Sequence, residues 1–323
     1  MDEFGLIEKY LAPLAIGHKG ALSLLDDAAI ISSRKDYELI ITKDAIAEGV
    51  HFLPNTSPEL IAKKLLRTNL SDIAAMGGVP KYYLIAAMLT GAIDEKWIGR
   101  FSKSLGEEQK IFGIHLIGGD TIKHSGPLSF SLTMIGEVKK GAALKRSGAK
   151  PGDGIYVSGT IGDGALGLKI LRGEIKAGKA AEKYLAGRYH IPQPRMDLGL
   201  RLAGIASACM DISDGLIADL GHICTVSKVS AIIEKEKIPL SPAVKTILKA
   251  APKFWDSIFS GGDDYELLFT VPPEKEKNLR MLAGKSGIGI TKIGNITKKI
   301  SEKVAILEKN RAFQLKNTGY SHF

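Results

Sequence analysis

Hydrophobic and polar positions along the chain switch between a period of two, typical of strands, and a period near 3.6, typical of helices. Strict alternation over residues 128–134 predicts a strand with one buried face and one face that is wet or meets a partner. Apolar positions recur on one stripe at 59–76 and at 95–112, which predicts two helices. Strands are also expected at 37–42 and 82–89. The first half therefore alternates strands with helices.

The second half continues this alternation. Its expected elements are strands at 155–158, 230–234, 265–271, 288–293 and 303–308 and helices near 163–172, 195–207 and 214–225. The stretch 139–167 is rich in Gly and Lys, which is typical of a joint between domains. We predict a mixed α+β fold with an N-terminal domain of residues 1–138 and a C-terminal α/β domain of residues 139–323.

Composition adds expectations about size and partners. The chain has 323 residues, of which 45% are hydrophobic, so it can bury a core and form about two domains. A net charge of +9 favours anionic partners. The lysines are nevertheless spread out and no stripe of basic and aromatic residues occurs, so we expect no nucleic-acid surface. Small anions such as nucleotides are the expected partners.

Cysteine usage and hydropathy favour a cytoplasmic protein. Cys209 and Cys224 have no metal-binding spacing and suggest no disulfide framework, which indicates a reducing compartment. No apolar run approaches the ~18 residues of a membrane span, and the acidic N-terminus lacks the apolar region of a signal peptide. We therefore expect no membrane partner.

Aspartates gather at glycine-bounded or strand-end positions, although the chain is basic overall. They are Asp26 and Asp27, Asp44, Asp72, Asp120, Asp211 and Asp214, and Asp263 and Asp264. Mg²⁺ is usually held by one or two carboxylates together with waters and phosphate oxygens, so scattered aspartates suit it better than a closed cage does. The pattern indicates phosphate chemistry.

Taken singly, these aspartates allow more than one interpretation. Asp72 lies on the apolar face of a predicted helix, where a carboxylate needs a cation or hydrogen-bond donors. Asp120 follows Gly118 and Gly119 at an expected strand end, but an ordinary turn would look the same. Asp214 either caps the next helix or joins Asp211 at a metal-phosphate site.

A glycine motif at residues 162–167 matches G-x-G-x-x-G after a predicted strand, as in a dinucleotide-binding fingerprint. That fingerprint also needs a second strand ending in an acid about 20 residues further on. The chain there is instead the polar stretch 176–183. A glycine turn that packs a strand against a helix is the better interpretation, and the absence of G-x-x-x-x-G-K-[ST] excludes a P-loop.

Together, the motifs follow an order that closely resembles the thiamine-monophosphate kinase family, of the superfamily that includes aminoimidazole ribonucleotide synthetase and selenophosphate synthetase. The matching stretches are EFGLI at 3–7, DDAA at 26–29, GVHF at 49–52, NLSDIAAMG at 69–77, LIGGDT at 116–121, RSGAKPGD at 146–153, DISDGL at 211–216, SGGDDYEL at 260–267 and GYSHF at 319–323. This resemblance implies a homodimer whose N-terminal sheets join in a barrel, with ATP bound near that interface.

The resemblance also implies residue roles in transfer of the γ-phosphoryl of ATP to thiamine monophosphate, giving thiamine diphosphate. Several Mg²⁺ ions would be held by Asp26, Thr42, Asp44, Asp72, Asp120, Asp211 and Asp214. Gly119, Asp120, Arg146 and Ser213 would contact the nucleotide, and His51, Asp263 and Tyr320 the thiamine monophosphate. No general base is assigned, because the attacking phosphate oxygen is already anionic near neutral pH.

Two of these roles carry their own arguments. Tyr320 could stack on the cationic thiazolium or on the pyrimidine. His51 also has a plain structural interpretation, as a hydrogen-bonded histidine that follows a strand.

Three departures from the family concern the rate and the number of metals more than the fold. The usual Gly-x-Gly before the paired aspartates is here Ser23-Leu24-Leu25, and the usual glutamate of the GGDD stretch is Asp263. Lys43 stands where the family has threonine. Its ammonium either takes over part of the charge of one metal or points away from the ligands.

Two other functions stay open on the sequence. One is a sister enzyme of the superfamily that uses ATP on another substrate, against which the GYSHF and DDYE stretches argue. The other is a degenerate nucleotide-binding protein that keeps the fold without turnover, which the altered 23–25 loop and Lys43 would favour.

Overall fold

The structure, a computed structural model, describes residues 3–24, 29, 31–32 and 34–315. The chain divides into two compact units. Unit 1 comprises Met1–Ile73 and Gly78–Gly141, and unit 2 comprises Ala74–Gly77 and Ala142–Phe323. In the described part of the chain, no helix combines the length and the hydropathy that crossing a bilayer requires.

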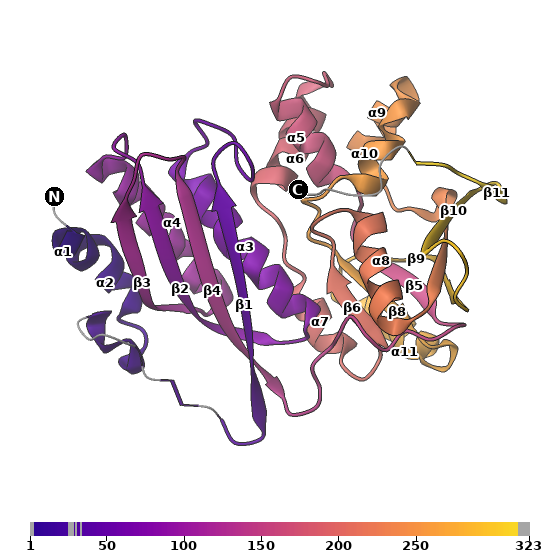
Figure 1. Cartoon of the computed structure of the whole chain (residues 1–323), viewed down its shortest axis with the longest axis horizontal. Helices are drawn as coiled ribbons and strands as arrows, with labels where there is room; N and C mark the ends of the chain where they lie inside the picture. The colour runs from indigo at the N-terminus through magenta and orange to yellow at the C-terminus, as the bar shows by residue number, and fades with distance from the viewer. Residues whose placement is uncertain (1–2, 25–28, 30, 33, 316–323) are drawn as a thin grey trace. The chain divides into compact units, whose positions relative to one another are not determined.

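Unit 1 is built on a four-stranded sheet in the order β1-β4-β2-β3 (Figure 1). The strands are β1 (Tyr37–Ala47), β2 (Val79–Leu89), β3 (His115–Lys123) and β4 (Ser129–Lys139). β4 pairs antiparallel with β1 and β2, whereas β2 and β3 are parallel. Two helices, α3 (Pro58–Ala75) and α4 (Glu95–Phe112), cover one face of the sheet (Figure 1). The three strands and two helices predicted for this region are thus present.

The alternation along β4 decides which face is buried. Phe130, Leu132 and Met134 are fully buried on the helix side. Phe130 stacks on Phe101 of α4 with ring centroids 4.8 Å apart, a geometry that adds to the gain from burying aromatic area. Asp94 caps α4 by accepting a hydrogen bond from the amide of Trp97. The apolar residues of strand β4 and of helix α4 therefore pack into one core.

The opposite face of this sheet is covered at one side only. The N-terminal segment forms α1 (Glu3–Leu6), a π-helix (Ile7–Leu11), α2 (Ala12–Ala15) and a 3₁₀ helix (Lys19–Leu24). Ala15 and Ala21 of this segment pack against Ile117 and Ile135. On edge strand β1, Ile41 remains 64% exposed. The face is therefore closed near β3 and open near β1.

Unit 2 is built on a seven-stranded mixed sheet in the order β11-β10-β7-β9-β5-β8-β6. Its strands are β5 (Gly154–Ser158), β6 (Ala208–Asp211), β7 (Ser230–Glu234), β8 (Leu267–Val271), β9 (Ile290–Thr297), β10 (Val304–Glu308) and β11 (Arg311–Ala312). Its helices are α5 (Asp163–Leu171), α6 (Lys179–His190), α7 (Met196–Leu202), α8 (Leu216–Ser227), α9 (Pro242–Ala250), α10 (Trp255–Ser260) and α11 (Glu276–Ser286), with short 3₁₀ turns at Lys235–Lys237, Pro252–Phe254 and Pro273–Lys275.

The expected elements of the second half are present, with one shortened. The helix expected at 195–207 ends at Leu202, and its last predicted residues form a loop that leads into β6. Helices α6, α9, α10 and α11 are not among the predicted elements. In α6 only Leu185 and Tyr189 are buried, so its apolar stripe is thin. The mixed α+β fold is confirmed.

Candidate functional site

A hydroxyl and two carboxylates share the helix-covered face of the unit 1 sheet. Thr42 of β1 donates a hydrogen bond from Oγ1 to Oδ2 of Asp72 on α3, at 2.6 Å. Asp44 follows Thr42 by two residues on the same strand, so both side chains point to the same face. Asp72 itself is half-buried, and its neighbour Asn69 is fully buried. These oxygen donors are of the hard type that Mg²⁺ prefers.

Lys43 lies on the other face of β1. It pairs in register with Thr133 of β4, and its Nζ lies 3.4 Å from Thr133 Oγ1. Since successive residues of a strand point to opposite faces, the ammonium is directed away from Thr42 and Asp44. Of the two alternatives for this lysine, the structure supports the one in which it points away.

Asp120 lies inside a strand, not at a strand end as predicted. β3 continues to Lys123. Across the sheet, Asp120 lies in register with Ala86 of β2, Ser131 of β4 and Ala45 of β1. This row points to the face opposite Asp44. The structure therefore does not bring Asp120 to the Thr42–Asp72 pair, and its carboxylate is exposed, accepting a hydrogen bond from the Thr121 amide at 2.8 Å.

A glycine is required beside Asp120. A Cβ on Gly119 would lie 2.1 Å from the carbonyl oxygen of Ile85 on the neighbouring strand. Any side chain at this position would push β3 away from β2, since real Cβ atoms do not approach an oxygen that closely. The Gly-Gly pair thus serves close pairing of two backbones.

A cavity of about 470 Å³ lies beside this strand, within unit 1. Its lining residues come from the N-terminal segment and from the sheet: Ile7, Leu11, Ala21, Leu24, Ala29, Ile31, Leu84, Ile85, Leu116, Ile117, Gly118, Gly119, Asp120, Thr121 and Ile135. Most of the lining side chains are apolar, and Asp120 and Thr121 contribute the polar ones. An apolar cavity with a few convergent polar groups is typical of a small-molecule site.

Two further predicted positions of unit 1 have defined local roles. His51 lies in the turn after β1, where its Nδ1 accepts a hydrogen bond from the Ala47 amide at 3.2 Å. This bond puts the proton of the neutral ring on Nε2. Leu24, in the altered 23–25 loop, has φ of 58°, a left-handed conformation that glycine would adopt without strain.

The metal-type loop of unit 2 follows β6. Asp211 is the last residue of that strand and is buried. Helix α8 has Gly215 at its N-cap, so Asp214 is not the capping residue. The amides of Ser213, Asp214 and Gly215 instead all donate to Oδ2 of Asp219, at 3.0, 3.1 and 3.2 Å. Burial, reinforced by the charge of Asp214, raises the pKa of the Asp219 carboxyl to about 7.

A second loop, Gly261–Glu266, runs beside the first. The Asp263 amide donates to the Ser213 carbonyl at 3.0 Å, and the Tyr265 amide donates to the Ile212 carbonyl at 2.9 Å. In return the Ile212 amide donates to the Glu266 carbonyl at 2.9 Å. Ser213 and Asp263, expected to contact nucleotide and thiamine respectively, are therefore adjacent. Here the structure brings two predicted residues together.

Arg146 is exposed and also belongs to unit 2. The carbonyl of its neighbour Lys145 accepts a hydrogen bond from the amide of Cys209 at 2.8 Å, so this segment runs beside β6. The Arg146 carbonyl accepts a hydrogen bond from Oγ of Ser227, the last residue of α8, at 3.4 Å, so the structure does not bring Arg146 to the β6–α8 loop at the other end of that helix.

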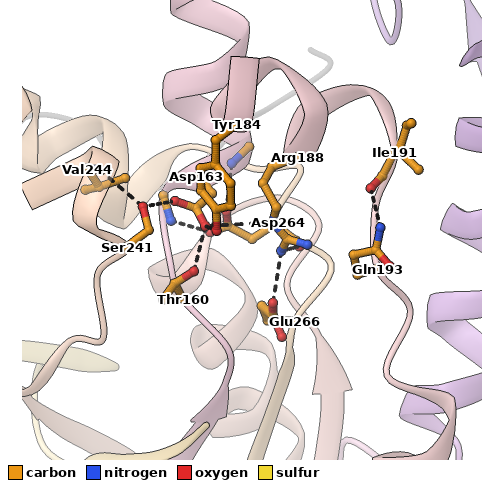
Figure 2. A network of polar contacts seen from close by, with 12 residues as sticks. Thr160, Asp163, Tyr184, Arg188, Ile191, Gln193, Ser241, Val244, Asp264 and Glu266 are labelled. Atoms are coloured by element: carbon orange, nitrogen blue, oxygen red, sulfur yellow. Dashed lines mark hydrogen bonds and ion pairs between the residues drawn. The ribbon is translucent and has the colours of Figure 1, made fainter. Parts of the chain in front are cut away.

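Two residues of the second loop, Asp264 and Glu266, belong to a buried polar network (Figure 2). Asp264 accepts hydrogen bonds from the Gly162 and Gly164 amides, and Glu266 from Arg188 at 2.9 Å and Arg195 at 2.6 Å. Sequence reasoning missed this network. Its signal was the glycine motif at 162–167 together with the acidic DDYE stretch, two segments whose contact no local pattern reveals.

Some predicted positions lie outside the described residues, namely Asp26 and Tyr320. Within the described ranges, no group of three His, Cys, Asp or Glu side chains lies close enough to hold a metal by itself. Mg²⁺ does not need such a group when phosphate oxygens and waters complete its shell.

Comparison with known proteins places these observations in a family. Models of AIR synthase related proteins match both halves, the N-terminal domain at residues 25–138 and the C-terminal domain at residues 150–306. The chain is 41% identical to the thiamine-monophosphate kinase of Haemophilus influenzae, with 100% of this chain and 98% of that protein covered.

Solved structures agree with this similarity. The thiamine-monophosphate kinase of Stenotrophomonas maltophilia K279a superimposes with a TM-score of 0.80 at 38% identity, covering 88% of this chain and 89% of that one. AaThiL complexed with AMPPCP and TMP superimposes with a TM-score of 0.79 at 32% identity, covering 99% of this chain and 97% of that one. Both units thus have counterparts in known folds.

Proposed function

Because the chain belongs to the thiamine-monophosphate kinase family, we propose that it transfers the γ-phosphoryl group of ATP to thiamine monophosphate, giving thiamine diphosphate. The observation that carries this proposal is similarity at about 40% identity to two thiamine-monophosphate kinases, over at least 99% of this chain and at least 90% of each relative. The AaThiL complex, which holds an ATP analogue with TMP, supports the same pair of substrates.

The metal role is proposed for two sets of carboxylates, described unit by unit. In unit 1 the bonded pair Thr42 and Asp72, with Asp44 on the same face, offers three oxygen donors. In unit 2 Asp211 and Asp214 flank the Ser213 backbone. When bound, Mg²⁺ would offset the repulsion between two polyanions during phosphoryl transfer. Asp120 and Asp26 are the remaining proposed ligands. Together these residues would hold several metal ions.

Nucleotide contacts are proposed for Gly119, Asp120, Arg146 and Ser213. Gly119 and Asp120 are among the residues that line the apolar cavity of unit 1, which supports a place for the nucleobase with the phosphates near Asp120. The Arg146 side chain is exposed and carries a permanent charge that suits phosphate oxygens.

Thiamine monophosphate is proposed to contact His51, Asp263 and Tyr320. Asp263 lies in the loop 261–266 of unit 2 and is half-exposed. A carboxylate there would attract the cationic thiazolium ring. No residue is needed as general base, since the attacking phosphate oxygen carries negative charge at neutral pH.

Assembly and location are also part of the proposal. Two copies would join the open faces of their unit 1 sheets into a barrel, which the exposed Leu39 and Ile41 of β1 support. Residues 1–138 would then act as the domain for ATP, metals and dimerisation, and residues 139–323 as the second domain. We propose a cytoplasmic location for the protein, because its proposed reaction consumes ATP.

The test is direct. Purified protein with Mg²⁺, ATP and thiamine monophosphate should form thiamine diphosphate, separated from the monophosphate by chromatography. Asp72→Asn should lower the rate about 10–100-fold, as expected for a change in metal ligation, whereas Asp197→Asn on the exposed surface of α7 should not. Tight ATP binding with no product in folded protein would instead support a degenerate homologue.

A further inference from the structure

The glycine turn at the start of α5 binds a carboxylate of the chain itself. Asp264 accepts a hydrogen bond from the Gly162 amide at 2.7 Å and from the Gly164 amide at 3.0 Å, and its side chain is fully enclosed. A helix N-terminus is a favourable place for an anion, because its free amides and its dipole both attract negative charge. The motif that resembles a dinucleotide fingerprint therefore holds a carboxyl group of the chain itself.

The two hydrogen bonds of Asp264 hold a loop whose backbone conformation is unfavourable. Asp263 and Tyr265, on either side of Asp264, have φ of 67° and 51°, in the left-handed region that residues with side chains avoid. Such conformations persist only where the surroundings impose them. Here Asp264 provides one anchor, and Glu266 a second through Arg188, Arg195 and Ser158.

The same loop is packed tightly against the metal-type loop that follows β6. Backbone hydrogen bonds join Asp263 to Ser213 and Tyr265 to Ile212. At Gly262 there is also no space for an added carbon atom between the two loops. A Cβ on Gly262 would lie 2.0 Å from the Ser213 carbonyl oxygen. A shift of one loop therefore has to displace the other.

We propose that Asp264 is a positioning residue that couples the thiamine-binding loop 261–266 to the metal-binding loop 211–214 through the Asp263–Ser213 backbone bond. This inference rests on the proposed function, which assigns Asp263 to thiamine monophosphate and Asp211 and Asp214 to metal. Asp264 touches neither ligand and acts through the backbone on both sides of it.

The first test needs no catalytic activity. Hydrogen–deuterium exchange of ligand-free protein is compared for wild type, Asp264→Asn, Asp264→Ala and the surface control Asp197→Asn. Asparagine keeps the volume but accepts only one of the two amide bonds, so it tests the idea even if the alanine variant does not fold. We expect amides of both loops to exchange about tenfold faster in Asp264→Asn. Faster exchange in loop 261–266 alone, or in neither loop, would overturn the coupling.

The second test separates positioning from general stability. Asp264→Asn should raise both the KM for thiamine monophosphate and the Mg²⁺ concentration for half-maximal rate, each by about threefold or more. Gly262→Ala, which separates the same loops from the other side, should show the same paired change. A lower kcat with both constants unchanged would mean only a smaller folded fraction and would overturn the role. If the wild-type protein formed no thiamine diphosphate, the proposed function would be refuted. The hydrogen–deuterium exchange result would still test the coupling between the two loops.

Discussion

Thr42 Oγ1 and Asp72 Oδ2 lie 2.6 Å apart, and this hydrogen bond joins edge strand β1 to helix α3. Asp44 points to the same face of β1. The bond occupies one carboxylate oxygen of Asp72 and holds its orientation, as outer partners commonly do for metal ligands. The position of a proposed metal ligand thus depends on a hydroxyl.

Removing that hydroxyl should weaken metal binding. Thr42→Val keeps the shape of the side chain but leaves Asp72 without this donor, so we expect the Mg²⁺ concentration for half-maximal activity to rise about tenfold. The free energy of unfolding should fall by about 1 kcal/mol. Thr42→Ser, which keeps the hydroxyl, is the matched control. An unchanged Mg²⁺ titration for the valine variant would remove Thr42 from the metal site.

Lys43 should not contribute to metal binding. Its Nζ faces Thr133 on the side of the sheet away from Asp44, and exposed charges are screened by salt. Lys43→Thr should therefore change the Mg²⁺ dependence of the rate by less than about twofold. A clear change in the number of metals bound, measured by calorimetry, would show that the ammonium takes over charge from one of them.

Ile41 should control assembly. It is 64% exposed on β1, where the sheet face is not covered by the N-terminal segment. A buried carboxylate without a partner is costly, so Ile41→Glu should convert the proposed dimer to a folded monomer in light scattering. Met281→Glu, at another exposed apolar position, should leave the mass unchanged. Equal masses for wild type and both variants would argue against this face as the interface.

The ion pair between α3 and α4 should contribute stability that acid removes. Hydrogen bonding from Arg100 lowers the pKa of Glu59 to about 2 from an ordinary 4.5. Because the folded pKa is lower, the contribution is present above about pH 4.5 and is lost as pH falls through about 2. The side chains are 49% and 37% exposed, so the effect stays below about 1 kcal/mol.

NMR titration of the carboxyl group checks this pair directly. Arg100→Gln should return the pKa of Glu59 towards its ordinary value, since the bidentate bond to both carboxylate oxygens is removed. Arg201→Gln, which removes a partner of Asp197 only, is the control. A Glu59 pKa that stays low without Arg100 would point to another cause.

Local periodicity predicted most of the elements. The alternation at 128–134 belongs to β4, and its apolar residues are the ones buried against α4. Periodicity alone does not predict that β3 extends beyond Gly118 and Gly119, because glycine lowers strand propensity. The reason for a glycine at 119 is the close approach of the Ile85 backbone on the neighbouring strand. Asp120 was therefore placed at a strand end, although it lies within the strand.

Long-range contacts were beyond such reasoning. Asp264 and Gly162 are separated by 102 residues and meet only when β5 and β8 pair. The glycine motif and the acidic stretch were each visible, yet nothing local connects an amide to a particular distant carboxylate. The direction of Lys43 could be resolved only from its pairing with Thr133. The motif order, by contrast, led to the family that the comparisons confirm.

The most direct measurement follows the transferred group. ATP labelled in its γ-phosphoryl group is incubated with the protein, Mg²⁺ and thiamine monophosphate, and the products are analysed by mass spectrometry. The proposed function predicts one labelled phosphoryl group in thiamine diphosphate and one ADP formed for each. ADP formed without thiamine diphosphate, or AMP with a transferred diphosphoryl group, would contradict it.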